Sequence, residues 1–396
     1  MSNLTEALPP LAERSTVIGW MRKNLFYSWG SIILTILSSL LIFLAVRGLL
    51  IWIFTVAKWR VIVVNLRLIM LGQYPLEDAW RVWVALALLS FLTGNSFGIW
   101  GRGARRISLT LAAIPLVLAI LPFGTPQRYW LVGVSAIGIL GWFLARGGGS
   151  SLQRSVIIGW LLWLPILFFL LHGYTEDTGW LPTVRTNLWG GLLLTLLLTI
   201  IGIVFSFPLG VLLALGRRSE LPVVRWVSIA YIELVRGVPL ITILFMAQLM
   251  LPLFLGITPD RVLRAMAGII LFSAAYLAEN VRGGLQAIPK GQFEAAQALG
   301  LNGFQSMVFI IMPQALRLII PILVGQFIAL FKDTALVSIV GLLDLVGIAR
   351  TVLAQPEFLG LQREVYAFIS LLYWVLSYAM SYMSQRLEVS LGVGER

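Results

Sequence analysis

The 396-residue sequence contains no cysteine and a single histidine, His172. The lack of cysteine excludes disulfide bonds, thiolate metal ligands and a cysteine nucleophile, and one histidine cannot form a histidine-paired catalytic unit or a histidine-rich metal site. None of the four lysines follows a glycine, so the chain lacks the Gly-Lys-Ser/Thr ending of a phosphate-binding loop. The sequence therefore predicts no metal centre and no ATP hydrolysis within this chain.

Charged residues are also scarce. They make up 12% of the chain, whereas 59% of its residues are hydrophobic and 15 are tryptophan; soluble domains carry about 25% charged residues. The 29 Lys and Arg outnumber the 17 Asp and Glu, but they form no dense basic run with interleaved aromatic residues. The net charge of +12 therefore does not indicate nucleic-acid binding, and the composition predicts a chain that lies in a lipid bilayer.

Ten apolar runs are long enough, allowing for tilt, to cross a bilayer as helices. The first five are 28–54, 80–100, 107–123, 129–145 and 155–172, and the second five are 188–215, 226–254, 265–280, 316–331 and 366–383. We expect an all-α polytopic membrane protein with about ten transmembrane helices. More Lys and Arg fall in inner than in outer segments if the N-terminus is cytoplasmic, so we predict that orientation.

The segment 48–71 is the ambiguous part of this topology. It is apolar but contains Lys58, Arg60 and Arg67. A helix lying in the membrane interface would place these charges at the water, and a re-entrant loop is the alternative.

Two stretches indicate boundaries within the chain. Residues 147–151 are glycine and serine, the composition of a flexible linker, and the polar stretch 173–187 is a plausible seam. We expect three parts: a cytoplasmic tail over 1–27, an N-terminal membrane extension over 28–186, and a second membrane unit over 187–396 whose cytoplasmic loop covers 283–315.

The loop before the last two spans has an unusual composition. Residues 292–299 are good helix formers, and Gly300 is placed to end that helix in the left-handed conformation. Asn302 and Gly303 indicate a turn, and a second short helix over 304–311 is expected to stop at Pro313. The pattern predicts two short helices on the cytoplasmic face, either a docking element or a simple connection.

The spacing within this loop points to docking. The pattern E-A-A-x3-G-x9-I-x-M-P over residues 294–313 resembles the EAA loop of importer-type ABC-transporter permeases. In that family the loop inserts into a groove on the ATP-binding subunit, which is helix-in-groove recognition. The resemblance implies that the following residues couple this chain to an ATPase: Glu294, Ala295, Ala296, Gly300 and Leu301. The small side chains of Ala295 and Ala296 permit close approach.

Three other segments are similar to the polar amino-acid branch of these permeases. They are YIELVRGVPL at 231–240, AYLAENVRGG at 275–284 and KDTAL at 332–336, where Ala335 stands in place of the more usual serine. The resemblance covers about residues 188–386 and implies a five-helix ABC permease core. It also implies a bacterial inner-membrane location, an amino-acid substrate and three kinds of partner: a second permease subunit, ATP-binding subunits and an extracytoplasmic solute-binding protein. No cofactor is expected in this chain, because ATP is bound by a partner.

Ionisable residues inside spans favour a substrate path, because a charge in a membrane helix usually faces a protein interior or a polar cavity. Glu233 and Arg236, and Glu279 and Arg282, each have the i,i+3 spacing that lets two side chains meet on one helix face. We predict that Glu233, Arg236 and Glu279 line the path; structural ion pairing at the cytoplasmic membrane edge is the alternative.

Gln326 and Asp333 are the candidates for direct substrate contact. Seven residues apart, they lie on one helix face, and Pro321 one turn earlier frees backbone carbonyl groups. Asp333 would pair with the ammonium group of an amino acid, and Gln326 would donate or accept a hydrogen bond. Alternatively, Asp333 is an interfacial anchor beside Lys332.

The sequence thus predicts the permease subunit of an ATP-driven amino-acid importer that performs no covalent chemistry itself. An ion-coupled secondary transporter would explain the carboxylates within spans but not the cytoplasmic helix pair. A membrane scaffold without transport activity would explain the helix pair but not the carboxylates.

Overall fold

The computed structural model describes residues 17–100, 125–146, 148–175, 179–256 and 258–390. In these ranges the chain forms helices and turns, and no β-strand is present. Contacts between Cα atoms divide the chain into two compact units, residues 1–60 and residues 61–396, which we call unit 1 and unit 2.

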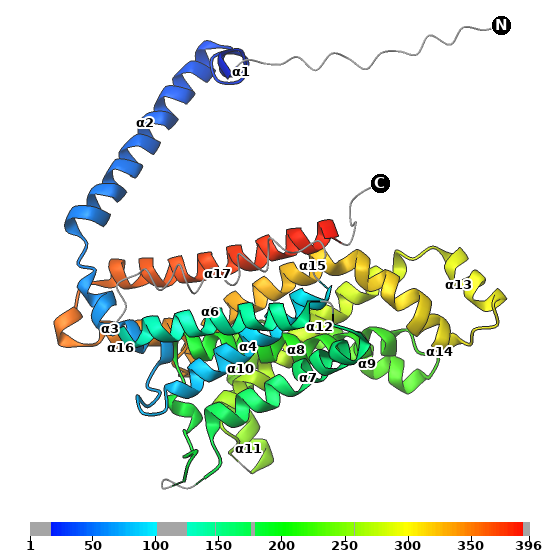
Figure 1. Ribbon diagram of the computed structural model, residues 1–396. Helices are drawn as coiled ribbons and strands as arrows, with labels where there is room; N and C mark the ends of the chain where they lie inside the picture. Colours follow the sequence, from blue (N-terminus) through cyan, green and yellow to red (C-terminus); the bar gives the residue numbers. More distant parts are fainter. Residues whose placement is uncertain (1–16, 101–124, 147, 176–178, 257, 391–396) are drawn as a thin grey trace, which may run out of the picture. The chain divides into compact units, whose positions relative to one another are not determined.

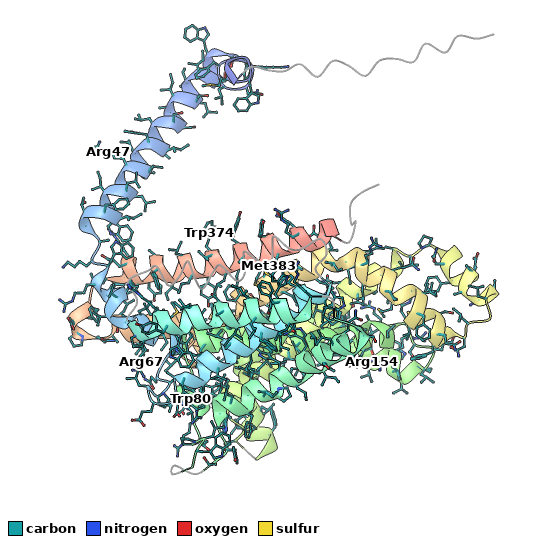
Figure 2. The ribbon with its side chains drawn as sticks, in the orientation of Figure 1. Arg47, Arg67, Trp80, Arg154, Trp374 and Met383 are labelled. Carbon is teal, nitrogen blue, oxygen red and sulfur yellow. The ribbon has the colours of Figure 1, made fainter. Side chains whose placement is uncertain are left out.

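Unit 1 contains α1 (Val17–Asn24) and the long apolar helix α2 (Trp29–Ile51), which continues as the π-helical turn η1 (Trp52–Val56) (Figure 1). Ser28 caps α2, because its Oγ accepts a hydrogen bond from the Ser31 N–H at 3.2 Å. None of the side chains of α2 is buried, and Figure 2 shows them, including Arg47, standing out from the helix. The expected first span is confirmed.

The first half of unit 2 contains α3 (Arg60–Leu71), α4 (Trp80–Trp100), α6 (Thr125–Ala145) and α7 (Ser150–His172). The backbones of α4 and α6 lie in contact, because a Cβ atom at Gly94 would come within 2.1 Å of the Gly138 carbonyl oxygen. Ser150 and Ser151 form the first turn of α7, so the glycine–serine linker is shorter than expected. The expected span 107–123 lies outside the described residues.

The second half of unit 2 carries the remaining helices. The long ones are α8 (Gly191–Arg217), α12 (Arg261–Gln286), α15 (Met312–Asp333) and α17 (Gln362–Ser390). Shorter elements are η2 (Thr186–Leu188), α9 (Pro222–Arg236), α10 (Leu240–Phe245), η3 (Met246–Met250), α11 (Leu251–Leu255), α13 (Lys290–Ala298), α14 (Gly303–Gln305), η4 (Ser306–Ile311), η5 (Thr334–Val340), α16 (Leu345–Leu353) and η6 (Pro356–Phe358).

Within the described ranges, eight helices are long and apolar enough to cross a membrane, and one bent pair makes nine. With the span 107–123 outside these ranges, the all-α polytopic fold with about ten spans is confirmed.

The expected span 226–254 is not one straight helix. It is the bent pair, in which α9 and the helical segment from Leu240 meet at 105°. The break lies at Gly237, Val238 and Pro239, and Pro239 is the N-cap of α10. Proline has no N–H to donate and disfavours helical geometry at the residue before it, so the chain turns here.

The ambiguous segment around residue 60 contains a helix that packs on protein. Val61, Ile62 and Ile69 of α3 are buried, and Arg67 donates from Nη2 to the Tyr74 carbonyl oxygen at 2.8 Å (Figure 2). At the end of α3, Gly72 has a φ of +65°, and a Cβ atom there would lie 2.4 Å from the Gly190 Cα. The segment is therefore helical over Arg60–Leu71, and its position relative to the membrane interface stays a prediction.

The main hydrophobic core joins both halves of unit 2. Trp163, Leu167 and Leu171 of α7 belong to the same buried cluster as Leu194 and Leu198 of α8. A second cluster includes α12, η4 and α15 residues. Burial of apolar surface in one cluster therefore joins the leading helices to the second half of unit 2. The predicted division at 186/187 is still a prediction.

Candidate functional site

The EAA-like loop forms two short helices joined by a glycine turn. Gly300 has a φ of +78°, the left-handed conformation expected for the end of α13. Asn302 caps α14: its Oδ1 accepts the Gln305 N–H at 2.8 Å, and Gln305 Oε1 accepts the Asn302 N–H at 3.0 Å. Figure 1 shows α13 and α14 at one end of unit 2, opposite α3 and α16.

The second helix does not stop at Pro313 as expected. The π-helical turn η4 follows α14, and Met312 donates its N–H to the Met307 carbonyl oxygen, five residues earlier. Pro313 then falls in the first turn of α15. Since a proline N–H is not needed at that position, the helix passes through.

The five predicted coupling residues do not all face outward. Glu294, Ala295 and Gly300 are exposed, and Leu301 is half-buried. Ala296 is only 2% exposed, so its small side chain lets α13 pack on its own chain and does not offer an open surface. Within the described residues, Glu294 has no hydrogen-bond or ion-pair partner.

Sequence reasoning missed two large apolar side chains beside Gly300. Leu299 is 78% exposed and Phe304 is 75% exposed. Their position on either side of the turn was a readable signal, because apolar residues on a polar loop often mark a protein contact. Around its glycine turn the loop therefore presents two exposed apolar side chains, Leu299 and Phe304, together with the acidic group of Glu294 on α13.

Helix α13 is held on the rest of unit 2 by two side-chain contacts and by one buried residue. The guanidinium of Arg218 lies over the ring of Phe293 at 5.9 Å. Gln314 of α15 donates from Nε2 to Gln292 Oε1 at 3.1 Å, and Ala296 is buried as described. These contacts connect α13 to the end of α8 and to the start of α15, so a displacement of α13 acts on both helices.

A charged network lies at the same end of unit 2. Arg217, the last residue of α8, contacts Glu233 Oε1 at 2.9 Å and Glu279 Oε1 at 3.1 Å through Nη1. Arg282 contacts Glu279 Oε2 at 2.7 Å, and Arg236 reaches the same oxygen at 3.9 Å. We call these five residues the Arg217 network.

The network corrects one expected pair. Glu279 and Arg282 pair within α12 as predicted, but among the described residues Glu233 is not paired with Arg236. Arg236 is the last residue of α9 and turns toward Glu279, with its guanidinium 5.6 Å from the Tyr276 ring centre. Glu233 instead pairs with Arg217, a partner that no local spacing in the sequence indicates.

Gln326 and Asp333 lie on one face of the continuous helix α15, as expected. Both are half-buried, whereas Lys332 is exposed. Within the described part of the chain neither Gln326 nor Asp333 has a hydrogen-bond or ion-pair partner, which leaves their polar atoms available to a ligand. Their contact with substrate stays a prediction.

The described residues contain no group of three or more His, Cys, Asp or Glu that could hold a metal ion.

Comparisons with known proteins extend the resemblance to the whole chain. Residues 206–391 match the family described as "Binding-protein-dependent transport system inner membrane component". The inner membrane amino-acid ABC transporter permease protein YhdY of Escherichia coli (strain K12) is 38% identical over 403 residues, covering 98% of this chain and 96% of that protein. The glutamate/glutamine/aspartate/asparagine transport system permease protein BztC of Rhodobacter capsulatus is 36% identical over 425 residues, covering 97% and 96%.

A solved structure described as an amino acid ABC transporter with histidines is 30% identical, covers 50% of this chain and 90% of its own, and has a TM-score of 0.45. The two full-length relatives include the leading helices, for which the sequence offered no motif. This chain belongs to the family of amino-acid ABC transporter permeases.

Proposed function

We propose that this chain is the transmembrane permease subunit of an ATP-driven amino-acid importer, in which it forms the translocation path and binds an ATP-binding subunit through α13 and α14. The exposed helix pair with the EAA spacing is the observation that carries this function. ATP is bound and hydrolysed by the partner, so this chain needs no cofactor and catalyses no covalent step.

The surface of the helix pair fits a groove on a partner protein. Leu299 and Phe304 provide apolar anchors, and exposed Glu294 provides a charge at the side of α13. Buried anchors surrounded by polar contacts carry most of the binding energy in protein interfaces. The supports of α13 described above explain how a movement of the partner reaches the spans.

The half-buried residues Gln326 and Asp333 of α15 support a path for an amino-acid zwitterion. Asp333 carries the charge that an ammonium group requires, and Gln326, about 10 Å further along the helix axis, supplies a neutral donor and acceptor. In a membrane helix such groups are costly unless they face a polar cavity or a partner. The path itself is completed by a second permease subunit, which covers the open side of α15.

The orientation follows from the loop. An ATP-binding subunit is cytoplasmic, so the α13 end of unit 2 faces the cytoplasm and the α16 end faces the extracytoplasmic solute-binding protein. We keep the cytoplasmic N-terminus that the distribution of Lys and Arg predicts, in a multi-pass protein of the bacterial inner membrane. Residues 1–27 then form a cytoplasmic tail, 28–186 a membrane extension and 187–396 the permease core.

Uptake by the reconstituted transporter tests this function. Proteoliposomes containing this chain, its permease partner and the ATP-binding subunits are supplied with the solute-binding protein and a labelled amino acid, with and without ATP. The proposal expects uptake only with ATP. Uptake driven by an ion gradient alone indicates a secondary transporter, and ATPase binding without uptake under any condition indicates a scaffold.

A further inference from the structure

Helix α9 is attached to the rest of unit 2 through a narrow stripe. Of its 15 residues only Ser228, Ile232 and Val235 are buried, and they lie on one face. Its end is the 105° bend at residues 237–239. A short helix that ends at a glycine and a proline, with so little buried surface, can change its angle without disrupting a large core.

One guanidinium connects α9 to two other helices. Arg217 closes α8 and reaches Glu233 on α9 at 2.9 Å and Glu279 on α12 at 3.1 Å. Arg236, the last residue of α9, adds a second, longer contact of 3.9 Å with Glu279. These charges hold the angle of α9 together with the apolar stripe and with the hydrogen bond that the Tyr231 hydroxyl of α9 donates to the Leu271 carbonyl oxygen of α12 at 2.6 Å.

The ion pairs of Arg217 with Glu233 and Glu279 can separate without leaving a buried charge unpaired. The side chain of Arg217 is 24% exposed and that of Glu233 is 56% exposed, so water replaces the lost partner of each when they separate. Glu279 is less exposed, but it keeps Arg282 of its own helix at 2.7 Å. Releasing Arg217 therefore leaves no buried charge without a partner, which is the usual obstacle to breaking an ion pair.

The network also adjoins the EAA-like loop. Arg218, the next residue after Arg217, contacts Phe293 of α13. A displacement of α13 by its partner therefore reaches the end of α8 one residue from the ion pairs. The position of the Arg217 network beside the EAA-like loop favours a role in changing the angle between helices over a role in binding substrate.

We propose that Arg217 is a positioning residue that latches α9 to α8 and α12 through Glu233 and Glu279, and that this latch opens and closes in each transport cycle. The proposal rests on the proposed function for the cycle itself. It gives Glu233 and Glu279 a mechanical role, whereas the sequence predicted that they line the substrate path or pair structurally at the membrane edge. Arg217 touches no substrate; it sets the angle of the bent pair.

A disulfide tests the latch, because a chain without cysteine allows a single specific cross-link. A Cβ atom at Gly216 lies 3.3 Å from the Ser228 Cβ, near the separation of about 3.5–4.5 Å in disulfides. The pair Gly216→Cys/Ser228→Cys therefore joins α8 to α9 beside Arg217. The matched control is Gly138→Cys/Ser90→Cys, where the same separation is 3.6 Å and the cross-link joins α6 to α4.

In proteoliposomes with the complete transporter, oxidation of the α8–α9 pair is expected to lower ATP-driven uptake about tenfold or more, and a reductant restores it. The oxidised control pair keeps its uptake. Undiminished uptake by fully cross-linked α8–α9 protein would overturn the latch. If the unmodified transporter shows no ATP-driven uptake, the proposed function itself fails.

A second pair of variants separates a latch from a static support. Arg217→Ala is expected to raise ATP hydrolysis without substrate about threefold and to lower the amount of substrate moved per ATP, because the resting angle of α9 is released. Arg217→Lys keeps one ion pair and returns both values toward those of the unmodified chain. Unchanged hydrolysis in Arg217→Ala, with a normal amount of bound ATPase, contradicts the proposal.

Discussion

The guanidinium carbon of Arg218 lies 5.9 Å from the ring centre of Phe293. Arg218 caps the end of α8, and Phe293 lies on α13. This cation–π contact connects a membrane-spanning helix to the helix pair that we propose docks the ATP-binding subunit. In the proposed function, such contacts transmit force from the ATP-binding subunit into the spans.

Phe293→Ala is expected to weaken that transmission. Loss of the ring removes a contact of about 0.5–1 kcal/mol at a partly exposed site, together with its packing. The ATPase should still bind, while substrate uptake per ATP hydrolysed falls about threefold. Phe293→Tyr, which retains the ring, serves as the control, and equal coupling ratios in Phe293→Ala and Phe293→Tyr would show that the contact transmits nothing.

Docking itself is expected to depend on the two exposed anchors of the loop. Leu299→Ala and Phe304→Ala should each weaken binding of the ATP-binding subunit about tenfold or more, as for truncated interface anchors. Leu253→Ala is the matched control, because Leu253 of α11 is 83% exposed but lies outside the loop. The check is a binding titration in detergent; an effect of the same size in the control would remove the anchor role.

Substrate recognition is expected to involve Gln326 and Asp333 of α15, whose side chains have no polar partner among the described residues. Gln326→Ala and Asp333→Asn should raise the substrate concentration that half-maximally stimulates ATP hydrolysis, because each removes a polar contact to the zwitterion. Lys332→Gln should leave this concentration unchanged. An effect of Lys332→Gln as large as that of Asp333→Asn would support the interfacial-anchor alternative.

The stability of the fold is expected to depend on pH through Asp344, which lies in the turn before α16 and outside the spans. Its carboxylate accepts the N–H groups of Val346 and Gly347 at 3.1 and 3.0 Å, but complete burial raises its pKa from 3.8 to about 7. The folded state therefore binds this proton more tightly than the unfolded state does. Its contribution favours folding below about pH 4 and is lost as the pH rises to about 7.

Thermal unfolding of the wild-type chain and of Asp344→Asn between pH 4 and 8 measures this contribution. The amide keeps one acceptor oxygen for the helix cap and cannot ionise. We expect the difference in stability between the two proteins to shift in favour of Asp344→Asn as the pH rises. A difference that stays constant over the range would show that Asp344 does not titrate there.

Gly72 is expected to tolerate no side chain. Its φ of +65° disfavours other residues, and a Cβ atom would meet the Gly190 Cα at 2.4 Å. Gly72→Ala should lower the free energy of unfolding by about 2 kcal/mol or more. Gly133→Ala in α6 is the control, because nothing lies within 4 Å of the added atom; equal melting temperatures in the two variants would contradict the close crossing of α3 and α8.

The features that the sequence predicted well are local. Span positions follow from the length of apolar runs, and the turn at Gly300 follows from the glycine that a left-handed helix end requires. Gly237 and Pro239 are also a local signal for the bend, but they lie inside a long apolar run that predicts one straight span. At Pro313 the π-helical turn absorbed the proline, which no simple rule for helix ends anticipates.

The features that the sequence did not predict join distant parts of the chain. Arg217 and Glu279 are 62 residues apart, so no helical spacing connects them. The crossing of Gly72 and Gly190 depends likewise on the packing of α3 on α8. The burial of Ala296 was equally hidden, since only the folded loop shows which face of α13 packs on its own chain.

Cross-linking from the loop tests the central claim most directly. In the chain without natural cysteine, Gln297→Cys on the exposed side of α13 carries a short thiol-directed cross-linker in the assembled complex, and Leu253→Cys on α11 carries the same reagent as a control. The account predicts that residue 297 is joined to the ATP-binding subunit and that residue 253 is not. An ATP-binding subunit captured from residue 253, with none captured from residue 297, would contradict it.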